Sequence, residues 1–181
     1  FGTVTKTAVA TGADLVAYSG FTTSNYLEQP YNTDLDFNSG DFAYCFWSNN
    51  PATASEYIGD RSEGNGNYRI ALYLSAGDNG TMNFYTRDTA ATEVSGIIGT
   101  PNQWAQIWCI RRGTSHEIWV NGINKGASVG TVRDVSYASG DAVQKIGVRY
   151  TIDNINTGKI ALFRVSATAP SAEQIAKIYN D

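Results

Sequence analysis

The chain has 181 residues, which is the size of one domain with its own hydrophobic core. Charged residues make up only 17% and aromatic residues 12%, the net charge is -4, and no basic run is present, so the composition disfavours a nucleic-acid partner. No apolar run reaches the roughly 18 residues of a membrane-spanning helix. Because the chain begins with Phe1 and not with Met, we expect residues 1–181 to be a single domain of a longer or processed protein.

Short runs of β-forming residues alternate with clusters of Gly, Asn, Asp and Ser along most of the chain. Regular turn signals without a long helical pattern predict an all-β fold. Two runs, residues 42–47 and 104–110, are apolar on both faces when they are read with a period of two. Strands of this kind are expected at the centre of a sheet, with one face in the core and the other covered or available for binding.

The two cysteines, Cys45 and Cys109, lie in these two runs, and their spacing matches no metal-ligand pattern. If the two strands pair, the cysteines could meet, and a disulfide would also require Cα atoms within about 7 Å of each other. Two buried thiols and a disulfide are both open at this point.

Residues 56–63 contain three acids, Glu56, Asp60 and Glu63. Their spacing does not place them on one face of a strand, because side chains alternate between the faces. We expect Glu56 to begin a strand, and Asp60 and Glu63 to lie in a polar loop.

The chain's only histidine, His116, stands beside Glu117 at the start of a predicted hairpin. Asn121-Gly122 favours a type I′ turn, which needs positive φ at both central residues. No Gly-x-Ser-x-Gly elbow surrounds a serine, so a serine triad is disfavoured. A single histidine also fails to supply the clustered ligands of a transition-metal site. We expect His116 to be exposed at a strand edge.

One short helix is predicted at the end of the chain. Ser171 and Gln174 form the pattern of a capping box after Pro170, and the apolar residues that follow fall on one stripe, namely Ile175, Ile178 and Tyr179. We expect this helix to cover an edge.

Five segments, taken in order, resemble the concanavalin A-like, laminin-G-like jelly-roll superfamily, which includes the pentraxins. They are residues 25–47, 103–113, 117–126, 146–150 and 158–181. Taken together, the sequences of these segments are most similar to domains of structural and tail proteins of tailed bacteriophages. The resemblance covers nearly all of the chain after Asn25 and implies a two-sheet antiparallel jelly-roll sandwich with one short C-terminal helix.

The resemblance also implies a relation between the cysteines, because pentraxins carry a disulfide at the positions that match Cys45 and Cys109. Assembly in a bacterial cytoplasm would keep thiols reduced. The resemblance therefore implies close approach of the two residues and leaves the bond open.

Calcium is the cofactor that the resemblance raises, since pentraxins bind it through rim loops with hard oxygen ligands. The candidate ligands are Asp60, Glu63, Asn65 and Asp153. Arg149 and Tyr150 stand where pentraxins have acids, which disfavours a double-calcium site and leaves a single ion as the open alternative.

Catalysis is not expected, although the superfamily includes glucanases with a Glu-x-Asp-x-x-Glu strand. That motif is absent from the sequence. A retaining glycosidase needs two carboxyl groups about 5–5.5 Å apart, and the three acids of residues 56–63 do not share one strand face.

The resemblance and the aromatic content together favour sugar binding at the rim loops. Sugars stack on aromatic rings and bond to polar side chains, and the candidates are Trp47, Tyr57, Asp60, Asn65, Asn67, Tyr68, Arg149, Tyr150 and Asp153. We expect a non-catalytic carbohydrate-recognition or adhesion module of a phage tail or fibre protein, located in the virion, with a cell-surface glycan as its partner.

The alternative is a structural decoration or assembly domain without a sugar ligand, whose partners are other virion subunits. Apolar outer faces could pack against neighbouring copies. A homo-oligomer is then expected, and a trimer by analogy with phage fibres.

Overall fold

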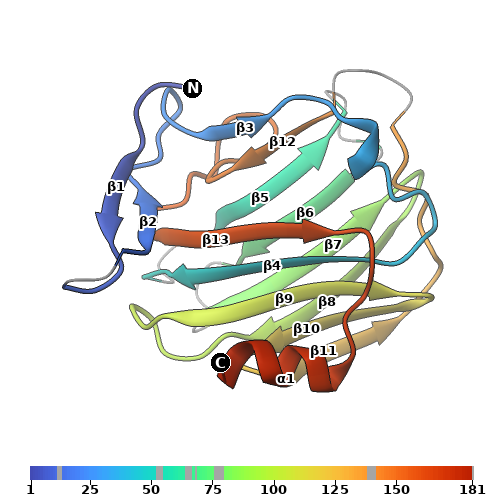
Figure 1. The fold of residues 1–181 in the computed structure, drawn as a ribbon. Helices are drawn as coiled ribbons and strands as arrows, with labels where there is room; N and C mark the ends of the chain where they lie inside the picture. The colour runs from blue at the N-terminus through green and yellow to red at the C-terminus, as the bar shows by residue number, and fades with distance from the viewer. Residues whose placement is uncertain are drawn as a thin grey trace.

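The structure is a computed structural model that describes residues 1–11, 14–51, 55–63, 67, 69–75, 80–137 and 142–180. Within these residues the strands form two antiparallel sheets that pack face to face (Figure 1). The seven-stranded sheet holds, in spatial order, β1 (Thr5–Ala8), β2 (Val16–Ser19), β13 (Lys159–Ser166), β4 (Phe42–Asn49), β9 (Ala105–Arg112), β10 (Ser115–Val120) and β11 (Ile123–Val129).

The six-stranded sheet holds β3 (Leu27–Gln29), β12 (Val143–Ile146), β5 (Glu56–Ser62), β6 (Arg69–Leu74), β7 (Thr81–Arg87) and β8 (Ala91–Ile97). A single turn of 3₁₀ helix (Thr33–Leu35) precedes β4, and one α-helix, α1 (Ala172–Asn180), ends the chain. This arrangement confirms the predicted all-β sandwich of two antiparallel sheets with one short C-terminal helix.

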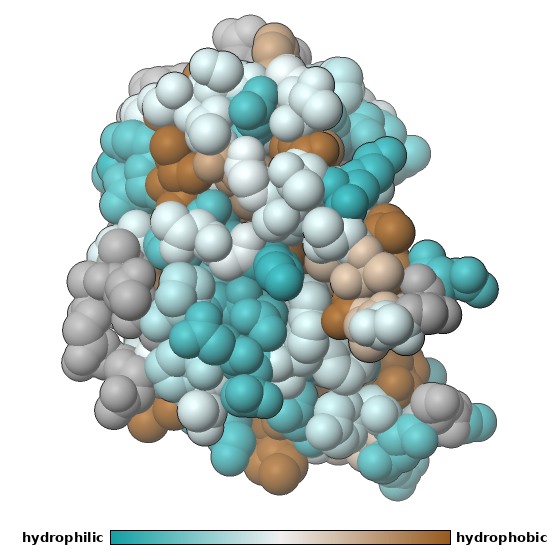
Figure 2. Space-filling view, turned by 90° about the vertical axis from the view of Figure 1, so that its left-hand side faces the viewer, coloured by the Kyte–Doolittle hydropathy of each residue, from teal (hydrophilic) through white to brown (hydrophobic). Residues whose placement is uncertain are grey.

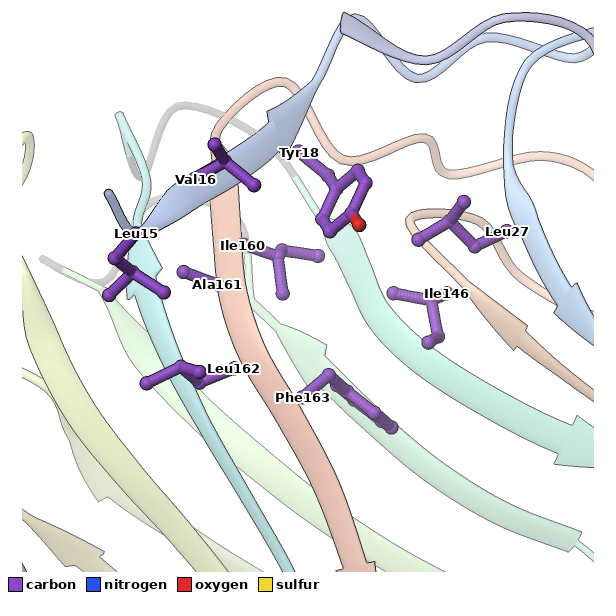
Figure 3. Close-up of a pocket in the computed structure, with 9 residues that line it drawn as sticks. All are labelled: Leu15, Val16, Tyr18, Leu27, Ile146, Ile160, Ala161, Leu162 and Phe163. Atoms are coloured by element: carbon purple, nitrogen blue, oxygen red, sulfur yellow. The ribbon is translucent and has the colours of Figure 1, made fainter. Parts of the chain in front are cut away.

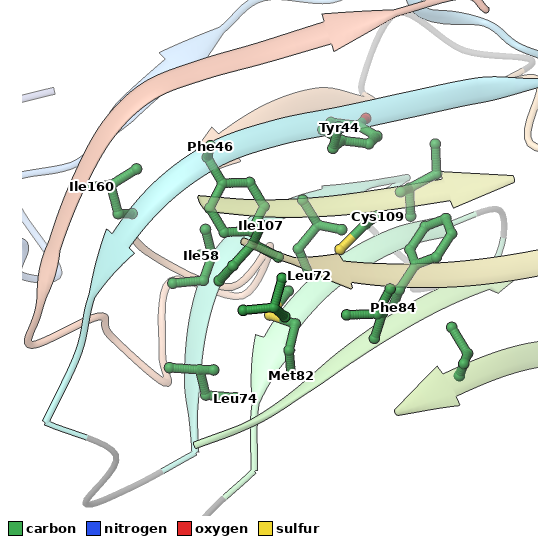
Figure 4. Packing of buried hydrophobic residues seen from close by; sticks show 14 of the residues in the cluster. Tyr44, Phe46, Ile58, Leu72, Leu74, Met82, Phe84, Ile107, Cys109 and Ile160 are labelled. Carbon is green, nitrogen blue, oxygen red and sulfur yellow. The ribbon is translucent and has the colours of Figure 1, made fainter. Parts of the chain in front are cut away.

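The core lies between the sheets and follows the predicted alternation. Phe42, Tyr44 and Phe46 of β4 point inward, and so do Ile107 and Cys109 of the neighbouring strand β9 (Figure 4). The six-stranded sheet completes the core from the other side with Ile58, Ile70, Leu72, Leu74, Met82 and Phe84. Each large apolar side chain removed from water contributes about 2 kcal/mol, so this cluster is a main source of stability.

The opposite face of the seven-stranded sheet is covered by α1. Ile175 is fully buried there against Cys45, Trp108 and Ile110. The predicted capping box is confirmed, because the Gln174 N–H donates to Ser171 Oγ at 3.2 Å and the Ser171 N–H donates to Gln174 Oε1 at 2.8 Å. The expectation of an edge cover is wrong, since the helix lies on the face of β4 and β9. It is too short to cross a membrane.

The two cysteines are free and buried on opposite sides of the sheet. In the β4–β9 pairing, Cys45 lies opposite Trp108 and Tyr44 lies opposite Cys109. The offset of one residue sends Cys45 to the outer face and Cys109 to the core. The disulfide and the close thiol pair implied by the resemblance are therefore corrected: the strands pair as expected, but the sheet itself separates the two sulfur atoms.

The sandwich is closed at one edge and open at the other. At the closed edge the backbones of β8 and β11 lie in contact, because a Cβ on Gly126 would come within 2.1 Å of the Ser95 carbonyl oxygen. Only glycine permits that approach. At the open edge the sheets diverge around a cavity between β2 and β13 on one side and β3 and β12 on the other (Figure 3).

A β-bulge interrupts β13 beside this cavity. Ala161 pairs with Trp47 and Arg164 with Cys45, so Leu162 and Phe163 together face the single residue Phe46. Leu162 takes a φ of +50°, a conformation that leucine rarely adopts, and its side chain is exposed. The extra residue turns Phe163 inward, where its ring stacks on Phe46 at 5.7 Å.

The prediction for His116 is wrong, because its side chain is completely buried on the inner face of β10. Its Nε2 lies 2.8 Å from Thr86 Oγ1, and its ring packs on Phe84 with centroids 5.2 Å apart. Burial, reinforced by the positive charges of Arg111 and Arg133, lowers the pKa of His116 to about 4. The predicted hairpin is confirmed: β10 pairs with β11, and the turn between them has positive φ at both Asn121 and Gly122.

The buried histidine should make folding stability depend on pH. Unfolded His116 takes up a proton near pH 6.5, whereas folded His116 does so only near pH 4, so stability is lost as pH falls between these values. The full effect is about 3 kcal/mol. Urea unfolding of the native chain and of His116→Gln between about pH 7 and pH 4.5 measures it. The native chain should lose more stability than the variant, and parallel curves would contradict the assignment.

Candidate functional site

The outer face of the six-stranded sheet gathers polar and aromatic side chains in cross-strand rows. One row runs Tyr57–Tyr73–Asn83–Ser95, the next Asp60–Ala71–Tyr85–Glu93, and the third Ser62–Arg69–Arg87–Ala91. Alternation of side chains explains this composition, since the residues between them point into the core. We call the surface formed by Tyr57, Tyr73, Tyr85, Tyr150, Arg69 and Arg149 the tyrosine–arginine platform.

Asp60 and Arg69 form a buried ion pair beneath the platform. Asp60 Oδ1 accepts from Arg69 Nε at 2.9 Å, and Oδ2 accepts from Arg69 Nη2 at 2.5 Å. The Asp60 side chain is completely buried and that of Arg69 is 10% exposed. Two parallel hydrogen bonds hold the guanidinium in one orientation.

Burial and pairing act against each other on these two groups. Burial raises the pKa of the Asp60 carboxyl, while the Arg69 guanidinium and the Tyr150 N–H oppose that rise. Burial disfavours the charge of Arg69, but the hydrogen bonds and the charge of Asp60 outweigh it and raise the pKa of the guanidinium. The pair is stable only as long as both partners are present.

Arg69 is surrounded by tyrosine rings. Its guanidinium carbon lies 4.8 Å from the ring centroid of Tyr150, 5.2 Å from that of Tyr57 and 5.9 Å from that of Tyr85. Tyr57 stacks on Tyr73 with centroids 5.2 Å apart. Contacts of this kind fix the rings of the platform, because a desolvated guanidinium attracts aromatic faces.

The loop after β12 brings the remaining members of the platform. The Tyr150 N–H donates to Asp60 Oδ2 at 3.0 Å, and the Tyr57 N–H donates to the Asn154 carbonyl oxygen at 2.9 Å. Ile152 in this loop takes a φ of +59°, which a β-branched residue rarely does, while its side chain packs on the core. Such strain is found at functional sites, where the surrounding structure holds it in place.

Arg149 projects from the same loop. Its guanidinium lies 5.2 Å from the Tyr150 ring centroid and 5.8 Å from that of Tyr57. It approaches Asp153 at 3.7 Å, and Asp153 also accepts from the Thr151 hydroxyl at 2.7 Å. The side chain of Arg149 is 32% exposed, so this group of the platform is open to solvent.

Five of the sequence candidates are therefore brought together in the structure, namely Tyr57, Asp60, Arg149, Tyr150 and Asp153. Asn67 is exposed just before β6, and Asn65 and Tyr68 lie outside the described residues. Trp47 is on the outer face of the other sheet, where it stacks on Tyr179 of α1 at 6.2 Å.

Three members of the platform, Arg69, Tyr73 and Tyr85, were missed by sequence reasoning. The signal that could have found them is the alternation of residues 69–74 and 81–87, in which aliphatic or aromatic core residues stand between polar or tyrosine residues. What the sequence could not provide is the pairing register that sets the polar residues of these two strands side by side.

A second concave feature is the apolar cavity at the open edge, which measures about 320 Å³. Among the nine side chains drawn around it, only Tyr18 carries a polar group (Figure 3). Seen from this end of the molecule, apolar side chains reach the surface in several patches separated by polar ones (Figure 2). Such a lining offers little to the hydroxyl groups of a sugar, and the platform is the better candidate.

A family model described as the concanavalin A-like lectin/glucanases superfamily matches residues 21–176. The chain belongs to this superfamily. No curated protein sequence matches it.

Solved structures with the superfamily's fold resemble the chain at low sequence identity. Domain 4 of AbnA, an extracellular arabinanase from Geobacillus stearothermophilus solved with arabinotriose, is 15% identical with a TM-score of 0.69, over 99% of this chain and 82% of that one. A heptameric SAP-like pentraxin from Limulus polyphemus is 17% identical with a TM-score of 0.59, over 77% of this chain and 69% of that one.

The binding domain of Paraclostridial Mosquitocidal Protein 1 is 14% identical with a TM-score of 0.74, over 98% of this chain and 45% of that one. The chain thus spans less than half the length of the toxin domain. At these identities the likeness shows the fold alone.

Of the four calcium ligands implied by the pentraxin resemblance, Asp60 is already engaged within the protein. Asp60 lies in β5 and not in a loop, which corrects the prediction, and its oxygens already accept from Arg69 and the Tyr150 N–H. The positive charge of a guanidinium in direct contact disfavours a dication at the same carboxylate. Over the described ranges no three His, Cys, Asp or Glu side chains gather as metal ligands, and Asn65 falls outside those ranges.

Replacing Asp60 with Asn should destabilise the fold severely, because Arg69 would remain buried without a counter-charge. We expect a loss of about 3 kcal/mol or more in the free energy of unfolding, measured with urea. Asp153→Asn is the matched control, since its carboxylate is 51% exposed and its pair with Arg149 should contribute less than about 1 kcal/mol. Equal effects of the two substitutions would show that the buried pair does not organise the platform.

Proposed function

We propose that the chain is a non-catalytic carbohydrate-binding module that holds its ligand on the tyrosine–arginine platform. The observation that carries the proposal is the clustering of four tyrosines and two arginines on one sheet face, fixed from below by Asp60. Ligand sites combine aromatic surface with a few well-placed polar groups. The superfamily and the arabinotriose complex of the AbnA domain support a sugar as the ligand.

The platform suits this task because its parts are rigid before any ligand arrives. Tyr73 donates its hydroxyl hydrogen to Glu93, and Tyr57 is held between Tyr73 and the two arginines. Aromatic rings that are already ordered lose little conformational freedom on binding. A sugar ring could stack on the half-buried tyrosines, with the arginines beside it as hydrogen-bond donors.

The acids near the platform support a binding role over a catalytic one. Asp60 is committed to Arg69, and Glu56 accepts from Asn50 Nδ2 at 2.8 Å and from the Thr157 N–H at 3.1 Å. Glu56 and Asp60 are both buried. Carboxylates that hold the fold in this way are poorly placed to donate protons to a glycosidic bond.

We further propose that the module serves adhesion in a tail or fibre protein of a tailed bacteriophage, and hence that it resides in the virion. This step rests on the combined sequence resemblance of five segments, residues 25–47, 103–113, 117–126, 146–150 and 158–181, to phage structural and tail domains. Its ligand would then be a glycan of the host cell surface.

Removing an aromatic ring from the platform should weaken sugar binding. A glycan array should first identify a ligand for the native chain, and titration calorimetry should then compare Tyr150→Ala with it. We expect a loss of affinity of about tenfold or more, as for a central aromatic contact. Tyr179→Ala on α1 is the matched control and should bind normally. Failure of every arrayed glycan to bind would sink the proposal.

A second candidate function is assembly with other subunits, and exposed apolar residues at the closed edge favour it. Ile97 of β8 and Ile123 and Val129 of β11 are 61%, 59% and 81% exposed. Ile97 and Ile123 line one surface hollow, and an exposed apolar patch is typical of contact surfaces. If assembly is the role, light scattering of the isolated chain should report an oligomer, such as a trimer, and a monomer at all concentrations would argue against it.

A further inference from the structure

We propose that the platform binds a sugar that carries a carboxylate group, which Arg149 recognises. This inference rests on the proposed function and specifies its ligand class. It follows from the hydrogen-bonding and charge capacity that the platform leaves unused.

Arg149 is positioned but not satisfied. Its Nε is buried, and no group in the described part of the chain accepts from it. Its contact with Asp153 is long, at 3.7 Å, and that carboxylate is shared with Thr151. The rings of Tyr57 and Tyr150 hold the guanidinium in place. A fixed cation with spare donors is a recognition element for an anion.

Arg87 adds a second positive charge on the same face. It lies directly opposite Arg69 in the β6–β7 pairing, and its side chain is half-buried. No ion pair or hydrogen bond involves its side chain within the described ranges. Like charges that face each other across two strands are destabilising, and Asp60 neutralises only Arg69. An anion bound on this face of the sheet would reduce that repulsion.

The acceptors of the platform are already occupied. Asp60 accepts from Arg69 and from the Tyr150 N–H, and Glu93 accepts from the Tyr73 hydroxyl. What remains are the guanidinium groups of Arg149 and Arg87, which only donate, and the hydroxyls of Tyr85 and Tyr150, which can donate or accept. A neutral sugar hydroxyl both donates and accepts, whereas a carboxylate only accepts and matches a planar guanidinium with two parallel bonds.

The experiment is a glycan array in which each uronic-acid or sialic-acid glycan is printed beside its neutral parent. The acidic glycan that binds most strongly is then compared with its methyl ester by titration calorimetry. The titrations use the native chain, Arg149→Gln, Arg149→Lys, Arg87→Gln and Arg164→Gln. Arg164 is exposed on the outer face of the other sheet and serves as the matched control. Thermal unfolding establishes that each variant is folded.

We expect the native chain and Arg164→Gln to bind the acid about tenfold more tightly than the ester. Arg149→Gln should bind acid and ester equally, because it lacks the charge that distinguishes them, and Arg149→Lys should keep part of the preference. Arg87→Gln should reduce the preference.

Equal binding of acid and ester by the native chain would overturn this inference and leave carbohydrate binding intact. A preference for the acid that survives in Arg149→Gln would overturn the assignment to Arg149. Absence of binding to any glycan, acidic or neutral, would overturn the proposed function as well.

Discussion

The ion pair between Asp60 and Arg69 connects the parts on which the platform depends. One carboxylate of β5 receives two hydrogen bonds from an arginine of β6 and a third from the backbone of the loop at Tyr150. The guanidinium that it fixes is in turn the centre around which three tyrosine rings are arranged. A charge that is costly to bury is thus used to align one loop and two strands.

The local part of this architecture could be read from the sequence. The two faces of residues 42–47 and the hairpin at Asn121-Gly122 were predicted because alternation and positive φ are properties of a few neighbouring residues. The helix cap at Ser171 was predicted for the same reason. Segments in the right order then indicated the superfamily, and with it the sandwich.

The errors concern facts that only long-range pairing decides. Asp60 looked like a loop acid because its partner Arg69 stands on the neighbouring strand, and charge patterns along the chain do not show which acid will be buried with a base. His116 looked exposed, but it shares its strand face with Ile118, and both side chains are completely buried. Cys45 and Cys109 lie on neighbouring strands, but the pairing register offsets them by one residue, so their side chains point to opposite faces of the sheet.

The bulge in β13 has a consequence for insertions and deletions. Residues 160–165 cannot alternate strictly, because Ile160 faces the core and strict alternation would then turn Arg164 inward and Phe163 outward. Leu162 is the extra residue of the bulge, and it reverses the alternation of the side chains that follow. Its own side chain is left at the surface. A chain without Leu162 would have one residue opposite Phe46 and unbroken alternation from Ile160 onward. In a central strand, loss of one residue usually turns every following side chain to the opposite face. Deletion of Leu162 alone should instead leave the core-facing residues of β13 pointing into the core.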